Sequence, residues 1–178
     1  ATALAICAST KAKFFRVPAF VDTVKTSYGL MPARAKQVIG LRSRLNLNHI
    51  AIFADIQVKH AQMVNKNKPI EQSASQAIKA GADSIIITGK WTGDAPRTED
   101  LETVHRAVGN FPILIGSGAT EDNLDILAKY ADGIIVGTAI KEGKNQHKSK
   151  QTNLKPYTAT INQSEASKFS DKFHRIFI

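Results

Sequence analysis

The sequence of 178 residues predicts an α/β protein built on a parallel β-sheet. Two observations lead to this class. Five short apolar segments each precede an amphipathic segment of helical period, and no part of the chain has the pattern of a convincing antiparallel hairpin. Alternating strands and helices require parallel strands joined by right-handed crossovers. Periodicity alone leaves open whether the sheet is open or closed into a barrel.

The first third of the chain contains two predicted strands. Residues 1–9 have the pattern of the end of a helix, and residues 13–17 that of a short strand. The connection over residues 18–31 is long for a compact α/β unit, which favours a binding loop or lid over a plain connector. Pro32 opens a helix. Its shared apolar face comprises Ala35, Val38, Ile39 and Leu45. Residues 50–56 then form a nearly unbroken apolar strand, as expected for a strand buried on both faces.

The middle of the chain repeats this alternation. Residues 57–68 predict a polar loop, and residues 69–80 predict a helix. A strand over residues 84–88 and a loop over residues 89–97 follow. Thr98 is expected to cap the next helix through its hydroxyl. The buried stripe of that helix comprises Leu101, Val104 and Val108.

Two strands with small-residue turns organise the next part of the chain. The strand at residues 112–115 ends in Gly116-Ser117-Gly118, and the strand at residues 133–136 ends in Gly137-Thr138. Glycine lets a backbone approach a ligand closely, and the N-terminus of a following helix, which Thr120 is expected to cap, adds partial positive charge. Either turn alone is explained by tight chain reversal. Two consecutive turns of this type favour a site for phosphate or another anion.

The C-terminal part begins with a basic stretch. The formal net charge is +9, and residues 141–155 contribute five lysines against one glutamate. Such a segment can attract phosphate ligands, RNA or an anionic membrane, but no aromatic residues are interleaved to stack on bases. We therefore expect residues 142–160 to be a flexible, solvated basic insertion. Ser164 is expected to cap a last helix, whose apolar stripe comprises Phe169, Phe173, Ile176 and Phe177 and packs on the outside of the sheet.

Composition and motifs exclude several classes of protein. The single Cys7 excludes an internal disulfide and a cysteine-based zinc site. The chain has no apolar run of the roughly 20 residues that a membrane span needs, so we expect a soluble protein. It has no nucleophile elbow, Walker sequence, dinucleotide fingerprint or zinc-ligand spacing. No motif requires a cofactor, and none is specific for nucleic acid.

Five motifs resemble the BtpA/SgcQ family over residues 1–143: FFRVPAFVDT, IFADIQVKHA, GKWTGDAP, IGSGAT and ADGIIVGTAIKEG. That family is assigned to the ribulose-phosphate-binding βα barrels. The resemblance implies a TIM (β/α)8-barrel type of fold, of which this chain covers the C-terminal part as one partial domain over residues 1–178. Residues 13–17 would be the fourth strand and residues 133–136 the eighth. The open edge would then need cover from an upstream segment, a second copy or a protein partner.

In such a barrel the site lies at the carboxyl ends of the strands. Asp55 is the candidate for acid-base work, or else forms a salt bridge with Arg16 or a helix cap. Lys59 is better placed to contact an anion than to form a Schiff base, and His60 either shuttles protons or is structural. Asp55 and His60 lack a third ligand, so no metal site is predicted. The remaining candidates for substrate contact are Arg16, Thr88, Lys90, Trp91, Thr92 and Asp94.

Three functions fit these observations. The first is an enzyme, a lyase, aldolase or isomerase, that acts on a small phosphorylated metabolite bound by the two glycine turns. The second is a noncatalytic assembly or stability factor, because the family takes its name from a factor needed for photosystem I accumulation. The third is a truncated, inactive fragment. The expected compartment is the cytoplasm or the mitochondrial matrix, or the thylakoid surface in a photosynthetic organism.

Overall fold

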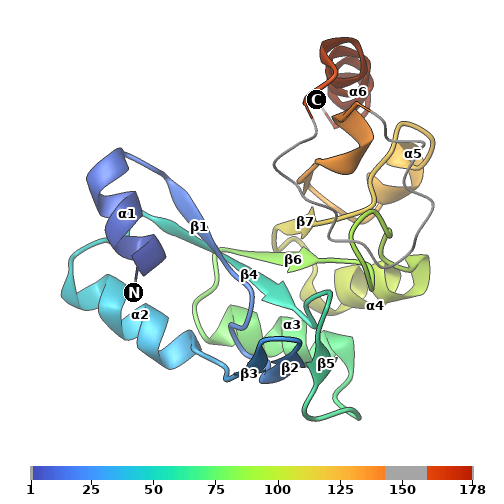
Figure 1. Ribbon diagram of the computed structural model, residues 1–178. Helices are drawn as coiled ribbons and strands as arrows, with labels where there is room; N and C mark the ends of the chain where they lie inside the picture. The colour runs from blue at the N-terminus through green and yellow to red at the C-terminus, as the bar shows by residue number, and fades with distance from the viewer. Residues whose placement is uncertain (1, 143–159, 178) are drawn as a thin grey trace.

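A five-stranded parallel sheet forms the centre of the computed structural model, which describes residues 2–142 and 160–177 (Figure 1). The expected insertion at residues 142–160 therefore lies almost entirely outside the described residues. The strand order is β1-β4-β6-β7-β8, and each neighbouring pair is parallel. The strands are β1 (Phe14–Val17), β4 (Ala51–Ile56), β6 (Ser84–Ile87), β7 (Ile113–Ile115) and β8 (Gly133–Ile134).

Helices connect these strands in the predicted alternation. They are α1 (Thr2–Thr10), α2 (Ala35–Arg44), α3 (Ile70–Lys79), α4 (Thr98–Val108), α5 (Leu124–Leu127), the short 3-10 helix η1 (Thr138–Ile140) and α6 (Gln163–Phe177). Because sequential parallel strands lie side by side with helices between them, the architecture is consistent with part of a (β/α)8 barrel. The predicted fold class is confirmed.

A second, antiparallel sheet shows that the expectation of no hairpin was wrong. Its strands, in the order β3-β2-β5, are β2 (Val24–Thr26), β3 (Gly29–Met31) and β5 (Gln62–Met63). The hairpin turns at Ser27-Tyr28, where Gly29 has φ of 112° and the Thr26 hydroxyl accepts from the amide of Tyr28. Strands of two or three residues are too short to show alternation, so both segments look like plain loops in the sequence. The small sheet stands beside the carboxyl end of β4 (Figure 1).

The core lies between the large sheet and the helices that cover it. All four residues of β6 are buried, as expected for a central parallel strand. Leu101 and Val104 of α4 are fully buried three residues apart, so they face the sheet from one side of the helix. The small Ala74 and Ala77 of α3 are likewise buried, which allows α3 to pack closely. The apolar period of these helices is therefore what fixes their orientation.

The ends of three helices differ from the predictions. At Thr98 the helix starts after an extended Arg97, without a side-chain cap hydrogen bond. Thr120 does not cap α5; instead its amide donates to Oδ1 of Asn123, directly before the helix. The carboxamide of Asn162 accepts from the amide of Glu165 and so occupies the capping role expected of Ser164. Asparagine, serine and threonine are all good caps, and the sequence alone did not separate them.

The last helix packs through its aromatic side chains, as predicted. Phe169 is buried, while Phe173 and Phe177 stack with ring centroids 4.4 Å apart and pack against the core. The ammonium group of Lys172 lies 2.7 Å from the carboxylate of Asp125 and ties α6 to α5. Among the described residues, no helix is both long enough and apolar enough to cross a membrane.

The middle of α2 offers a direct test of helix propensity. Gly40 lies inside this helix, and a methyl group added there would meet no heavy atom within 4 Å. We expect Gly40→Ala to raise the free energy of unfolding by about 0.5–1 kcal/mol, because alanine loses less conformational entropy in a helix than glycine. Urea unfolding measures this change. An unchanged or lower midpoint would contradict the helical assignment at this position.

Candidate functional site

Side chains from four neighbouring strands meet at the carboxyl edge of the large sheet. Arg16 lies within β1 and Asp55 within β4, while Thr88 and Gly116 directly follow β6 and β7. A Cβ atom added at Gly116 would lie 2.8 Å from Cγ2 of Thr88 and 3.3 Å from Nη2 of Arg16. The space above Gly116 is therefore already filled by these side chains. The sheet brings together Arg16, Asp55, Thr88 and Gly116, which are far apart in the sequence.

Arg16 and Asp55 form a two-point ion pair. Nε of Arg16 donates to Oδ2 of Asp55 at 2.7 Å, and Nη2 donates to Oδ1 at 2.6 Å. The Asp55 side chain is completely buried, whereas that of Arg16 is 33% exposed. Burial raises the pKa of Asp55 above its ordinary value, and the hydrogen bonds from Arg16 oppose this rise; the same bonds raise the pKa of Arg16. Asp55 thus holds the guanidinium in place through two hydrogen bonds.

Lys59 adds a second cation next to this pair. Its amide donates to the hydroxyl of Thr88 at 3.0 Å, which anchors the loop after β4 to the end of β6. Burial is the largest cause that lowers the pKa of Lys59; the positive charge of Arg16 lowers it further, and Asp55 acts in the opposite direction. An amine held in this way gives up its proton more readily than an exposed lysine does. A bound anion would reverse this effect, because it favours the charged amine.

The loop after β4, which carries His60, is hydrogen-bonded to the loop after β6. Nε2 of His60 lies 2.8 Å from the hydroxyl of Thr92, and the imidazole and Trp91 rings are 5.4 Å apart between centroids. The amide of His60 donates to the carbonyl of Lys90, whose own amide donates to the carboxylate of Asp94. Burial, and secondly the charge of Lys59, lowers the pKa of His60. These candidates therefore line one rim beside Lys59.

The two glycine turns have different surroundings. The hydroxyl of Ser117 accepts from the amide of Gly89 at 2.9 Å and donates to the carbonyl of Asp94 at 2.8 Å. Gly118, with φ of 69°, presses against the backbone of residues 94–95. The first turn thus holds the neighbouring loop tightly. Gly137, by contrast, is exposed and has open space at the Cβ position, and Thr138 begins η1.

A buried polar cluster was not foreseen from the sequence. Asp22 is 3% exposed; its Oδ1 accepts from the ammonium of Lys68 and the hydroxyl of Ser73, and its Oδ2 accepts from the amide of Gln57. The cluster joins the loop after β1 to the loop after β4 and to α3. One signal for it was present, since Asp22 and Asp55 are the only acidic residues among the first 70.

The net charge of the chain is unevenly distributed. Residues 1–70 contain 11 lysines and arginines against 2 aspartates, a net charge of +9, whereas residues 71–178 contain 13 of each sign. Both of these aspartates are buried and paired, with Lys68 and with Arg16. Within residues 2–70, therefore, no carboxylate side chain is exposed to offset the cations. Apart from Arg42, which pairs with Asp83, the cations of this segment contribute an excess of positive charge.

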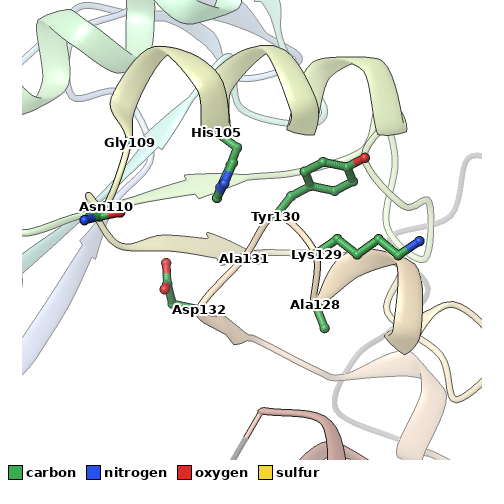
Figure 2. Close-up of a pocket in the computed structure, with 8 residues that line it drawn as sticks. All are labelled: His105, Gly109, Asn110, Ala128, Lys129, Tyr130, Ala131 and Asp132. Atoms are coloured by element: carbon green, nitrogen blue, oxygen red, sulfur yellow. The ribbon is translucent and has the colours of Figure 1, made fainter.

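A hollow of about 280 Å³ lies at the opposite edge, near the amino ends of β7 and β8 (Figure 2). His105 of α4 and Tyr130 approach edge to face across it, with ring centroids 6.0 Å apart. The carboxylate of Asp132 accepts from the amide of Ile113 and thereby holds the start of β7. In βα barrels this edge serves stability, whereas ligands bind at the carboxyl edge. We therefore regard the hollow as structural.

The possible metal ligands do not gather. In the described ranges 2–142 and 160–177, no group of three or more histidine, cysteine, aspartate or glutamate side chains is arranged to hold a metal ion. Asp55 is committed to Arg16, and His60 contacts Thr92. At the ion pair itself the charged groups are thus two cations, Arg16 and Lys59, and the buried carboxylate of Asp55.

Comparisons with known proteins identify the family. The model of the BtpA family matches residues 1–161. The photosystem I biogenesis protein BtpA of Synechocystis is 37% identical over 145 residues, which cover 81% of this chain and 50% of that protein. An uncharacterised protein of Pyrococcus horikoshii is 36% identical over 142 residues (79% and 53% covered), and an uncharacterised mitochondrial protein of Caenorhabditis elegans is 37% identical over 142 residues (79% and 50%).

These relatives are about twice as long as the matched region, so the chain spans about half the length of the curated relatives it matches. The match begins at the first residue and includes α1, the five parallel strands and the candidate site between them. It also includes the small antiparallel sheet. The chain belongs to the BtpA family.

Proposed function

We propose that this chain binds a small phosphorylated metabolite at the carboxyl edge of its parallel sheet. The observation that carries the proposal is the convergence of Arg16 and Lys59 beside the buried Asp55. Two cations with only one carboxylate leave an excess positive charge at the edge. A phosphate group would neutralise that charge and accept hydrogen bonds from both side chains.

The same groups suit proton-transfer chemistry of a lyase or isomerase. The lowered pKa of Lys59 brings its amine closer to the range in which a side chain can both accept and donate protons. Asp55 would keep Arg16 oriented toward the anionic part of the ligand, and His60 and Trp91 would form one wall. Gly137 and Thr138, which follow β8 three strands away from β4, offer an open turn for a contact with another part of the ligand.

The charge distribution supports an anionic ligand independently of the site. A surface over residues 2–70 without an exposed carboxylate attracts anions from a distance and raises their rate of association. This contribution is screened by salt, since the Debye length falls from about 30 Å at 0.01 M to about 10 Å at 0.1 M salt. Weaker binding at higher ionic strength is therefore part of the proposal.

Thermal unfolding with inorganic phosphate and a panel of sugar phosphates tests the proposal. A ligand at about 100 times its dissociation constant should stabilise the folded chain by about 2.7 kcal/mol. We expect Lys59→Gln to abolish this stabilisation and Lys79→Gln, which removes an exposed lysine on α3, to leave it nearly unchanged. If no phosphate compound raises the melting temperature of the wild-type chain, or if both variants respond equally, the site is not the one proposed here.

A second candidate is a noncatalytic assembly or stability factor. The specific observation in its favour is the name of the Synechocystis relative, a photosystem I biogenesis protein. In that case protein contacts, and not the ligand, would be essential. Lys59→Gln would then leave binding to a partner protein intact, whereas a metabolite-dependent function would be lost.

The outer edge of β1 is where a partner chain would pair. Within the described residues β1 pairs with β4 only, and both Phe14 of β1 and Ile6 of α1 are more than half exposed. An upstream segment, a second copy or another protein would cover this edge. Sedimentation of the purified chain at several concentrations distinguishes a self-associating protein from a monomer. A truncated, inactive fragment would show neither association nor phosphate binding.

A further inference from the structure

The buried cluster around Asp22 is bonded to the loop that bears Lys59. Both carboxylate oxygens of Asp22 are engaged: Oδ1 by Lys68 and Ser73, and Oδ2 by the backbone amide of Gln57 at 3.0 Å. The aspartate and lysine side chains are 2% and 7% exposed. A buried ion pair with every oxygen satisfied holds its neighbours in one arrangement, because any movement would leave a buried charge without a partner.

Gln57 is held in a conformation that its residue type rarely adopts. It is the first residue after β4, and its φ of 47° lies in the left-handed region. For a residue with a Cβ atom this conformation is costly unless surrounding contacts impose it. Two contacts do so here: the amide donates to Asp22, and the side-chain amide donates to the carbonyl of Lys68 at 2.9 Å.

The turn at Gln57 decides where the next residues go. A left-handed residue at the end of a strand bends the chain sharply, and two residues later Lys59 is anchored to Thr88, followed by His60 with φ of 59° anchored to Lys90. The ionisable groups near the Lys59 amine are Arg16 and Asp55 from the sheet and His60 from the same loop. The half-buried position of Lys59 among them depends on this bend.

We propose that Asp22 is a positioning residue for Lys59, acting through the left-handed backbone of Gln57. The inference rests on the proposed function, in which Lys59 binds the ligand. The contacts of the buried Asp22 are with Lys68, Ser73 and the amide of Gln57, so it acts on Lys59 through the backbone. Its role is to keep the Lys59 amine beside Arg16 and Asp55 and away from bulk water, in the state that a phosphate would find.

The reactivity of the Lys59 amine measures this role without any ligand. Labelling with a small amine reagent over a range of pH, read by mass spectrometry of the Lys59 peptide, reports the pKa of that amine. In Asp22→Asn the one remaining carbonyl oxygen accepts from the charged Lys68, and the new NH₂ group lies opposite the amide of Gln57. Since both of these groups are donors, the hydrogen bond to Gln57 is lost. We expect the labelling midpoint of Lys59 to shift upward, toward that of an ordinary exposed lysine. Ser73→Ala removes a different partner of Asp22 and should leave the midpoint at the wild-type pH.

A matched pair at Gln57 keeps the test decisive if Asp22→Asn does not fold. Gln57→Val and Gln57→Gly both remove the side-chain amide, but only valine resists a positive φ, whereas glycine adopts it freely. We expect Gln57→Val to shift the labelling midpoint of Lys59 upward and Gln57→Gly to keep it at the wild-type pH. The inference is overturned if folded Asp22→Asn or Gln57→Val labels like the wild type, or if the valine and glycine variants shift equally. A wild-type chain that binds no phosphate would remove the proposed function but would leave this result intact.

Discussion

Replacement of Arg16 by methionine is expected to lower the free energy of unfolding by about 3–5 kcal/mol. The variant leaves the carboxylate of Asp55 completely buried and without the two hydrogen bonds that it accepts from the guanidinium. Urea unfolding monitored by circular dichroism measures the loss.

The double variant Arg16→Met/Asp55→Leu tests whether the loss of stability in Arg16→Met comes from the unpaired carboxylate of Asp55. Removing both charges together avoids an unpaired buried carboxylate, so the double variant should regain most of the stability lost by Arg16→Met. Lys79→Met, on the exposed face of α3, is a control for the loss of one positive charge. Additive losses in the double variant would show that the two residues are not coupled in the way the geometry requires.

The loss at Arg16 should also grow as the pH rises. The folded pKa of Asp55 is already raised above the unfolded value of about 3.9, chiefly by burial, and removing Arg16 raises it further. A raised carboxyl pKa contributes stability below the unfolded pKa, and this contribution is lost as the pH rises through the folded pKa. The difference between wild type and Arg16→Met should therefore be small near pH 3 and larger near pH 7. A difference that shrinks with rising pH would contradict this assignment.

Gly118→Ala is expected to lower the free energy of unfolding by about 2–5 kcal/mol. The added Cβ atom would lie 2.1 Å from the amide nitrogen of Ala95, and the backbone at residue 118 has φ of 69°. Overpacking costs about 1–3 kcal/mol and a left-handed residue about 1–2 kcal/mol more. Because the obstacle is backbone, no side-chain rotation relieves it. Chemical unfolding measures the loss. The amides of residues 89–95 should also exchange faster with solvent, because this loop has separated from the turn.

Gly137→Ala is the matched control at the second turn. Nothing lies within 4 Å of the Cβ position, so Gly137→Ala causes no overpacking; its φ of −144° and ψ of −73° leave only a backbone cost, and the loss should be smaller than that of Gly118→Ala. Should the two alanine variants be equally stable, the packing of the first turn against residues 94–95 would be wrong. The control also serves the proposed function, because a methyl group at an open ligand contact would weaken ligand binding without unfolding the chain.

Much of the candidate site follows from strand order alone. Asp55 and Arg16 sit within apolar segments, and Thr88 and Gly116 sit at the ends of such segments; parallel strands place these positions on one edge. The sequence did not show that Asp55 is committed to Arg16, since either an acid-base role or a salt bridge fits the same residues. Nor did it show that Ser117 is engaged by Gly89 and Asp94, because hydrogen bonds between distant loops leave no periodic signal.

The sequence by itself determined the parallel α/β class, the order of the large elements and the family. Apolar period and strand-helix alternation are local properties, and the family motifs are continuous stretches of residues. Only the tertiary structure decided the small antiparallel sheet, the buried Asp22 cluster and the left-handed turn at Gln57. These features depend on partners dozens of residues apart, such as Asp22 with Lys68 and Ser73. Their stability comes from burial of paired charges and hydrogen bonds, which exists only once the chain has folded.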